Sequence, residues 1–177
     1  MRKAVVLLIP VAAVLIGSAV VATDLDEIIA RHAEARGGLE KIKSMNSMKT
    51  FGKTHMGELE FPFITYHLRP NKMKIESSIQ GQKMIQCFNG ETGWYINPMS
   101  GSWDPQEMDE RGIKELKTHA DLDGFLIDPK EKGYKVELIG EDEVEGSPVY
   151  RLLVTDTADL HIDVYVDAEY FLEIKWT

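Results

Sequence analysis

From Ser47 onward, apolar and polar residues alternate with a period of two, which is the period of a β-strand whose two faces meet different surroundings. In residues 160–167 the even positions are Leu, Ile, Val and Val, and the odd positions are His, Asp, Tyr and Asp. One face of the sheet must therefore be wet and the other covered. Short turn signals separate the runs and predict antiparallel strands at 49–60, 61–68, 72–79, 83–88, 93–97, 134–140, 149–155, 160–167 and 171–176.

Only two regions have helical periodicity. Asp24 and Glu27 form a capping-box pair before residues 25–33, and Gly-Gly at 37–38 ends that helix before a further turn or two at 39–45. Residues 105–119 have the pattern of an amphipathic helix. A sheet of so many strands is expected to curl. The few helical residues can cover only part of its apolar face, so that face lines either a ligand cavity or a filled core.

The N-terminus has the layout of a secretory signal peptide. Arg2 and Lys3 precede the uncharged residues 4–16, and small residues follow up to Ala22. We expect a signal peptide at 1–22, cleaved after Ala22, and a single exported domain at 23–177. The alternative is an uncleaved anchor, since residues 4–21 are long enough to span a bilayer.

Composition excludes several classes of protein. A net charge of -9 opposes binding to nucleic acid, and a single cysteine cannot form an intramolecular disulfide or a structural zinc cluster.

Cys87, with His55 or His67 as a partner, is a candidate nucleophile, but a position within a strand favours a buried, inert thiol. No G-x-S-x-G nucleophile elbow occurs.

Metal binding is weakly indicated. His161 and Asp163 share one face of a strand, but two ligands make a poor site. The acidic run 141–143 is typical of a solvated hairpin tip rather than a calcium loop. We therefore predict no catalytic residue, no metal and no cofactor.

Several short motifs resemble those of a known family. They are Leu-Arg-Pro-Asn-Lys-Met-Lys-Ile-Glu at 68–76, Phe-Asn-Gly-Glu-Thr-Gly-Trp-Tyr-Ile-Asn-Pro at 88–98, Ala-Arg-Gly-Gly-Leu-Glu-Lys-Ile at 35–42, Leu-Asp-Gly at 122–124 and Tyr-Val-Asp at 165–167. In this order they resemble the outer-membrane lipoprotein-sorting family, the LolA/LolB-like periplasmic carriers, over nearly the whole mature chain.

The resemblance implies an α+β fold in which a curved antiparallel sheet forms an incomplete, half-open β-barrel covered by helices. It also implies a periplasmic carrier that shields the acyl chains of lipoproteins, or another lipid, between an inner-membrane donor and an outer-membrane acceptor. Two alternatives remain: a periplasmic sensor or signalling module that detects lipoproteins with the same fold, and a hydrolase acting on lipid or glycan.

The resemblance also assigns residues. Arg69 matches the arginine that holds the covering helices closed, the alternative being a surface ion pair. The other covering residues are Met108, Ile113, Leu116 and Phe125. The expected cavity lining is Met73, Ile75, Met84, Trp94, Ile96, Leu152, Val154, Ile162 and Val164.

In one respect the sequence departs from the family pattern. It stops at Trp176-Thr177, inside a predicted strand, where the carriers usually continue with further strands. An exposed strand at 171–176 invites pairing with another chain. We therefore expect either a chain truncated at its C-terminus or a partner that supplies the missing edge.

Overall fold

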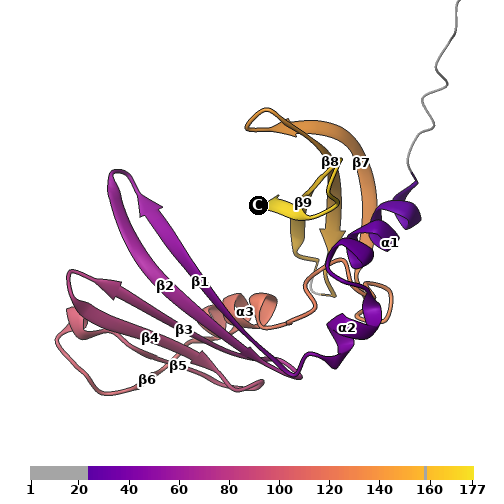
Figure 1. The fold of residues 1–177 in the computed structure, drawn as a ribbon. Coiled ribbons are helices and arrows are strands. Elements are labelled where there is room, and N and C mark those ends of the chain that lie inside the picture. Colours follow the sequence, from indigo (N-terminus) through magenta and orange to yellow (C-terminus); the bar gives the residue numbers. More distant parts are fainter. Residues whose placement is uncertain (1–23, 158) are drawn as a thin grey trace, which may run out of the picture.

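The computed structural model describes residues 24–157 and 159–177, which form two curved antiparallel sheets and three α-helices (Figure 1). The signal peptide predicted for residues 1–22 lies outside the described residues. The helices are α1 (Leu25–Ala35), α2 (Leu39–Ser44) and α3 (Glu110–His119), with a 3-10 turn η1 (Pro98–Ser100). The strands are β1 (Ser47–Met56), β2 (Leu59–Leu68), β3 (Lys72–Ile79), β4 (Gln82–Phe88), β5 (Gly93–Ile96), β6 (Gln106–Glu107), β7 (Lys135–Val144), β8 (Ser147–Thr155), β9 (His161–Asp167) and β10 (Glu173–Trp176).

The strands are connected in the simplest possible order. One sheet has the order β1-β2-β3-β4-β5-β6 and the other has the order β10-β9-β8-β7, so each strand pairs with its neighbours in the sequence. The antiparallel curved sheets and the small number of helices are confirmed. The described strands form two separate hydrogen-bonded sheets, and the predicted incomplete barrel with its cover of helices is not confirmed.

The six-stranded sheet has one face toward α3, which we call the inner face. Residues directly opposite each other on antiparallel strands share a face. Met73 on β3 is opposite His67 on β2 and Phe88 on β4, so these three lie on the inner face. The same register places further apolar side chains there, from β1 to β4: Met48, Met56, Leu59, Phe61, Phe63, Ile75 and Met84.

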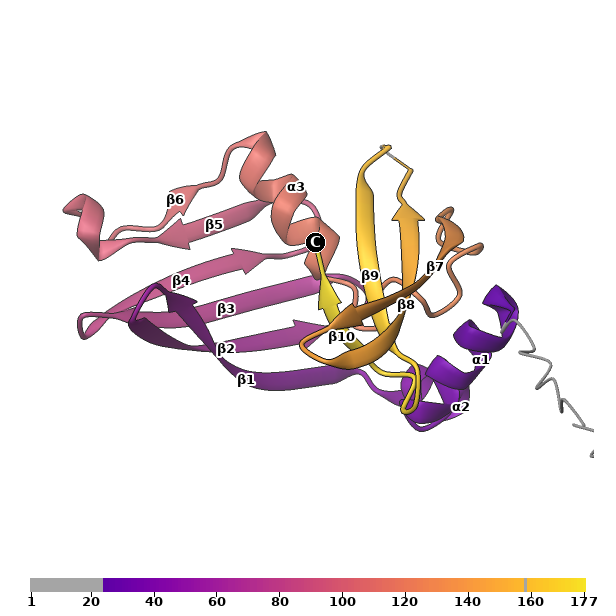
Figure 2. The same ribbon diagram turned by 90° about the horizontal axis from the view of Figure 1, so that it is seen from above.

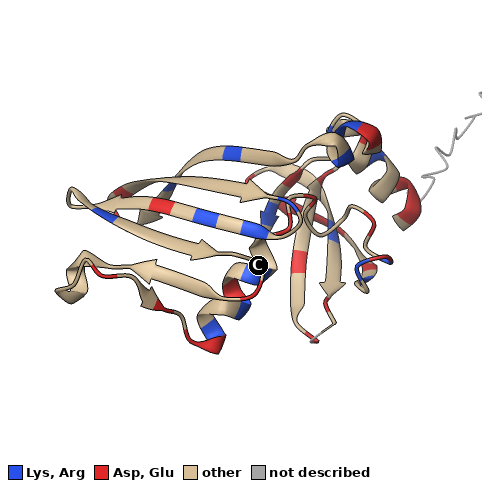
Figure 3. Cartoon of the chain, turned by 90° about the horizontal axis from the view of Figure 1, so that it is seen from below, with Lys and Arg blue, Asp and Glu red and all other residues tan. Residues whose placement is uncertain are grey.

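The helix α3 covers only part of the inner face. Leu116 and Ala120 are buried against Met73 and Phe88 near one end of the strands. At the other end, the hairpin of β1 and β2 leaves Met56 and Leu59 65% and 60% exposed. Figure 3 shows long stretches of this sheet without charged residues. The apolar area therefore exceeds what the single helix covers.

The four-stranded sheet, in contrast, has a filled core. Leu152, Val154 and Val164 are fully buried and pack with Ile28 of α1 and with Leu126 of the segment that follows α3. The polar alternation puts Arg151 and Asp163 on the opposite, wet face, with Nε of Arg151 2.9 Å from Oδ1 of Asp163. The thin cover inferred from the sequence thus applies to the six-stranded sheet only.

Several predicted boundaries are wrong. The run 49–60 contains a hairpin turn, because Gly57 takes up a positive φ of 62° and Met56 pairs with Leu59. The acidic run 141–143 lies within β7 and not at a hairpin tip. The helix expected at 105–119 begins only at Glu110, after the short strand β6.

The caps of the two main helices also differ from each other. Asp24 is the N-cap of α1, as predicted, but its side chain makes no capping hydrogen bond. At α3, the side chain of Asp109 accepts a hydrogen bond from the backbone N–H of Gly112 at 2.8 Å. Within the described ranges 24–157 and 159–177, no helix has the length and apolar character needed to cross a membrane.

Candidate functional site: the hollow around α3

The helix α3 lies in the angle between the two sheets, as Figures 1 and 2 show from two directions. Three pockets adjoin it, with volumes of about 490, 930 and 330 Å³. We call them pocket 1, pocket 2 and pocket 3 in that order. Ligand sites in proteins typically measure about 300–1,000 Å³. The space around this helix is therefore large enough for a small ligand or a lipid chain.

Pocket 1 lies between the six-stranded sheet and α3. Its apolar lining comes from both elements and comprises Ile75, Met84, Met108 and Leu116; Ile85 and Ile96 also adjoin it, although the register places their side chains on the outer face of the sheet. Polar residues also line it: Gln86, Tyr95, Asn97, Glu107, Asp109, Glu115 and His119. Burial lowers the pKa of His119, so its ring is neutral at neutral pH. Such a mixed lining suits an amphiphile better than a purely apolar molecule.

Pocket 2 lies on another side of α3, toward the four-stranded sheet. Ile113, Phe125, Tyr134 and Ile162 supply apolar surface. The remaining lining contains charges of both signs, from the turn after β2, from α3 and from the loops: Arg69, Glu110, Lys114, Lys117, Asp121, Asp123 and Asp156. Pocket 2 therefore lies between α3 and the four-stranded sheet, and its lining is more charged than that of an apolar cavity.

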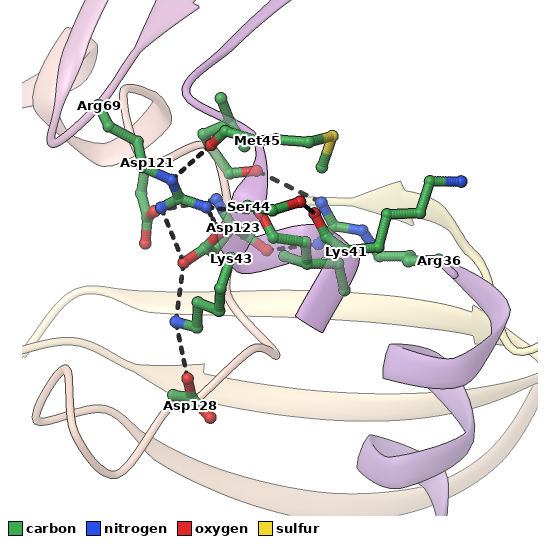
Figure 4. Close-up of polar contacts among 12 residues, drawn as sticks. Arg36, Lys41, Lys43, Ser44, Met45, Arg69, Asp121, Asp123 and Asp128 are labelled. Atoms are coloured by element: carbon green, nitrogen blue, oxygen red, sulfur yellow. Dashed lines mark hydrogen bonds and ion pairs between the residues drawn. The ribbon is translucent and has the colours of Figure 1, made fainter. Parts of the chain in front are cut away.

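Arg69 fastens the loop after α3 to the rest of the molecule (Figure 4). Its guanidinium donates to the carboxylate of Asp123, with Nη1 3.1 Å from Oδ2. It also donates to the backbone oxygens of Met45, at 2.7 Å, and Ile42, at 2.9 Å, at the end of α2. One side chain therefore joins the turn after β2, the end of α2 and the loop after α3. Arg69 is thus not an isolated surface ion pair, but these contacts do not involve α3 itself, and the role of Arg69 in holding the cover closed stays a prediction.

Asp123 is the buried centre of this cluster, with a side chain only 4% exposed. Lys43 provides a second cation, since its Nζ lies 3.0 Å from Oδ2 of Asp123 and 2.7 Å from Oδ2 of Asp128. Burial alone raises the pKa of Asp123, but hydrogen bonds from Arg69 and Lys43 outweigh burial and hold that pKa at about 2. The carboxylate is therefore ionised, and we call the contacts among Arg69, Lys43 and Asp123 the latch.

Most of the predicted site residues do meet around α3. Met73, Ile75, Met84, Ile96 and Ile162 line one or more of the three pockets, and so do the predicted covering residues Arg69, Met108, Ile113, Leu116 and Phe125.

Four predicted lining residues do not adjoin these pockets. Leu152, Val154 and Val164 belong to the filled core of the four-stranded sheet, because α1 covers them. Trp94 is opposite Cys87 on β4, whereas Tyr95 is opposite Gln86, which lines pocket 1. Since neighbouring residues of a strand point to opposite faces, Trp94 lies on the outer face of the sheet.

Sequence reasoning missed the partners in the latch. In the sequence, Asp123 stands out only as part of the Leu-Asp-Gly motif at 122–124, and nothing marks Lys43. The remaining signal was chemical: an aspartate within the apolar run 122–127 needs a cation if it is buried. That expectation alone does not say which Lys or Arg side chain pairs with Asp123.

The candidate nucleophile Cys87 and the candidate metal ligands His161 and Asp163 have ordinary structural roles. Burial raises the pKa of Cys87, which disfavours the thiolate that a nucleophile requires. Asp163 is held by Arg151, and Nδ1 of His161 lies 3.0 Å from the hydroxyl of Thr155. Within residues 24–157 and 159–177, no group of three or more His, Cys, Asp or Glu side chains is arranged to hold a metal ion.

Comparison with known proteins gives structural similarity at low sequence identity. No family model matches the chain, and no curated protein matches it. Among solved structures it is similar to a DUF1329 family protein from Desulfovibrio piger, with a TM-score of 0.49 and 13% identity over 87% of this chain and 73% of that one. It is also similar to a LolA superfamily protein from Nitrosomonas europaea, with a TM-score of 0.48 and 12% identity over 88% and 71% of the two chains.

A third similar structure is a domain from Vibrio parahaemolyticus named for outer-membrane lipoprotein sorting, with a TM-score of 0.47 and 10% identity over 84% and 69% of the two chains. The names of the last two structures coincide with the family that the sequence motifs resemble. Because each of these TM-scores is below 0.5 and each identity is at most 13%, these similarities assign no function to the chain.

Proposed function

We propose that the protein is a periplasmic carrier that holds an acyl chain, of a lipoprotein or of another lipid, in the hollow around α3. The observation that carries this proposal is the apolar inner face of the six-stranded sheet, of which α3 covers only one end. Transfer of each methylene group from water to such a surface contributes about 0.8 kcal/mol. A chain of eight methylenes therefore gains about 6 kcal/mol when it is fully buried.

The helix α3 and an acyl chain compete for the same surface. Leu116 is buried against Met73 and Phe88, while Met108 and Ile113 pack at its side. An acyl chain offers the same kind of contact without directional bonds, so it can replace these side chains when α3 moves away. The hollow would then enlarge as the ligand enters.

The latch controls how easily α3 moves in this proposal. The Arg69–Asp123 contact fixes the loop that directly follows α3, and Asp123 is paired with two cations. Displacement of the helix strains or breaks this contact, so the latch favours the closed form. The signal-peptide pattern at residues 1–22 supports export, after which membrane-bound partners would donate and accept the ligand.

The first experiment is native mass spectrometry of protein purified from an exporting host, followed by titration with a fluorescent fatty acid. We expect co-purified acylated species and saturable uptake. The absence of both, or hydrolysis of a fatty-acid ester by the protein, would contradict the proposal.

A matched pair of variants tests the location of the site. Met84→Trp narrows pocket 1, whereas Met99→Trp makes the same change at an exposed methionine that lines none of the three pockets. We expect Met84→Trp to weaken fatty-acid uptake about tenfold or more, since it excludes several methylenes from the pocket. Equal uptake by both variants would place the acyl chain elsewhere.

A further inference from the structure

The outer face of the six-stranded sheet, on the side away from α3, has a charge opposite to that of the chain as a whole. The register of β1 to β5 places on this face five lysines and two glutamates, namely Lys49, Lys53, Lys72, Lys74, Lys83, Glu60 and Glu76. The pairing of β6 adds one carboxylate at the edge of the sheet, Glu107. The outer face therefore has an excess of two positive charges, whereas the whole chain has a net charge of -9.

The two glutamates within this face are already paired with lysines. Glu76 is paired twice, with Nζ of Lys74 at 2.5 Å and Nζ of Lys83 at 2.8 Å. Glu60 is paired with Lys53, at 2.6 Å. Within residues 24–157 and 159–177, Lys49 and Lys72 have no carboxylate partner. Their ammonium groups are therefore available to an anion from outside the chain.

The unpaired lysines lie in two neighbouring rows of side chains at one end of the strands. In one row, Tyr66 on β2 is opposite Lys49 on β1 and Lys74 on β3. In the next row, Leu68 is opposite Lys72. We call these residues and Phe51, which adjoins Lys49, the basic patch; its members are Lys49, Phe51, Tyr66, Leu68, Lys72 and Lys74.

Aromatic and apolar side chains lie directly beside the ammonium groups of the basic patch. Nζ of Lys49 lies 4.8 Å from the ring centroid of Phe51 and 5.1 Å from that of Tyr66. Nζ of Lys74 lies 5.4 Å from the ring centroid of Tyr66. Cation–π attraction thus holds these ammonium groups against apolar surface. Phe51 is 70% exposed and Leu68 is 50% exposed, so much of this apolar surface is in contact with water.

We propose that the basic patch docks the protein on a lipid bilayer that contains anionic head groups. Lysines attract anionic lipids, and exposed aromatic and aliphatic side chains enter the boundary between head groups and acyl chains. The patch extends over three strands, which are about 4.8 Å apart, and so meets several lipids at once.

The remaining charge of the chain fixes the orientation of this docking. Outside the outer face the chain is acidic, and an anionic surface repels it. The outer face therefore turns toward the lipid, and the hollow around α3, on the opposite side of the sheet, turns away from it. This inference goes beyond the proposed function and does not depend on the acyl-chain site.

The test is co-sedimentation of the exported protein with phosphatidylcholine vesicles, with and without phosphatidylglycerol. At low salt we expect binding to the anionic vesicles to be about tenfold or more above binding to the neutral ones. High salt should remove this difference, because it screens the attraction between lysines and lipids. Equal binding to both kinds of vesicle, or binding to neither, would overturn the inference.

A matched pair of double variants connects the binding to the basic patch. Lys49→Gln/Lys72→Gln removes the two unpaired ammonium groups and should weaken binding to anionic vesicles about tenfold or more. Lys41→Gln/Lys130→Gln removes the same charge at exposed positions in α2 and in the loop before β7. This control should bind nearly as well as the unaltered protein. Equal loss in the two double variants would show that only net charge matters and that the patch is not the docking site.

Tryptophan fluorescence reports the orientation independently of charge. Trp94 lies on the outer face and is 37% exposed, whereas Trp176 lines pocket 3 between the sheets. Lipids brominated in their acyl chains should quench the protein's fluorescence, and Trp94→Phe should lose more of that quenching than Trp176→Phe. The reverse order would mean that the hollow faces the bilayer, which contradicts the inference.

Two further outcomes separate this inference from its alternatives. If soluble polyglutamate binds the basic patch and anionic vesicles do not, the partner is an acidic protein and the bilayer assignment is wrong. Met84→Trp, which narrows pocket 1, should bind anionic vesicles like the unaltered protein. If it binds them as weakly as the Lys49→Gln/Lys72→Gln variant, the vesicles are held through the acyl-chain site and not through the patch.

Discussion

Arg69 and Asp123 lie 54 residues apart in the sequence, yet Nη1 of the arginine donates to Oδ2 of the aspartate at 3.1 Å. Arg69 follows β2 of the six-stranded sheet, and Asp123 belongs to the segment that leads from α3 to the four-stranded sheet. The pair thus connects the support of the hollow to its cover. Under the proposed function, the strength of this contact would decide how firmly α3 is held.

Arg69→Leu is expected to destabilise the fold and accelerate ligand release. The variant leaves the buried Asp123 with Lys43 as its remaining cation and removes the donors to the oxygens of Met45 and Ile42. We expect a loss of about 2–3 kcal/mol in the free energy of unfolding, measured by urea denaturation. Arg111→Leu, at an exposed position of α3, is the control. Equal stability of the two variants would show that the latch contributes nothing.

Stability should fall in acid because of Asp123. Its pKa is about 2 in the folded protein against 3.8 ordinarily, so the ionised carboxylate stabilises the fold above about pH 4. This contribution, about 2 kcal/mol, is lost as the pH falls from about 4 to 2. Asp123→Asn should therefore show a smaller loss of stability over that interval than the unaltered protein. Hydrogen bonds from Lys74 and Lys83 also lower the pKa of Glu76 to about 2. Because Glu76 is present in both proteins, its contribution cancels when their stabilities are subtracted.

Gly52→Ala should disturb the uncovered part of the inner face. Gly52 is opposite Phe63, and a Cβ at Gly52 would overlap the ring of Phe63, which lies across the glycine. Either the ring or the backbone must shift, at a cost of about 1–3 kcal/mol. Thermal unfolding measures this cost. The double variant Gly52→Ala/Phe63→Leu removes the ring and should recover part of the stability; no recovery would locate the strain elsewhere.

Cys87 should react slowly with alkylating reagents. Burial raises the pKa of its thiol, which lowers the thiolate fraction at neutral pH. We expect carboxymethylation by iodoacetate at pH 7 to be several-fold slower than that of a small free thiol, followed by mass spectrometry. Unfolding in urea should restore the ordinary rate. A fast reaction of the folded protein would reopen the hypothesis of a nucleophilic cysteine.

Local patterns predicted the elements better than their assembly. The bounds of β3 (Lys72–Ile79) agree with the prediction because alternation and flanking turns define a strand locally. The division of the strands into two sheets depends on which strand edges pair across long distances in the sequence. Alternation of apolar and polar residues does not encode this pairing. The same limit explains Trp94 and Ile96, since alternation puts them on one face of the strand but the register with β4 decides that this face is the outer one.

The candidate site was foreseeable in part for the same reason. Ile113 and Leu116 follow from helical spacing, and Arg69 follows from the resemblance. Leu152 and Val164 have the same apolar pattern as Ile75, but α1 packs over them, and only the three-dimensional structure shows which sheet a helix covers.

The division of the β-strands into two sheets bears on the range of ligands that the proposed carrier could accommodate. No backbone hydrogen bond joins a strand of one sheet to a strand of the other within the described residues, so the sheets can splay without unzipping either one. Widening would cost side-chain packing and the contacts of the latch, but no backbone hydrogen bond between strands. If the protein holds acyl chains as proposed, the same two sheets would therefore accommodate chains of unequal length.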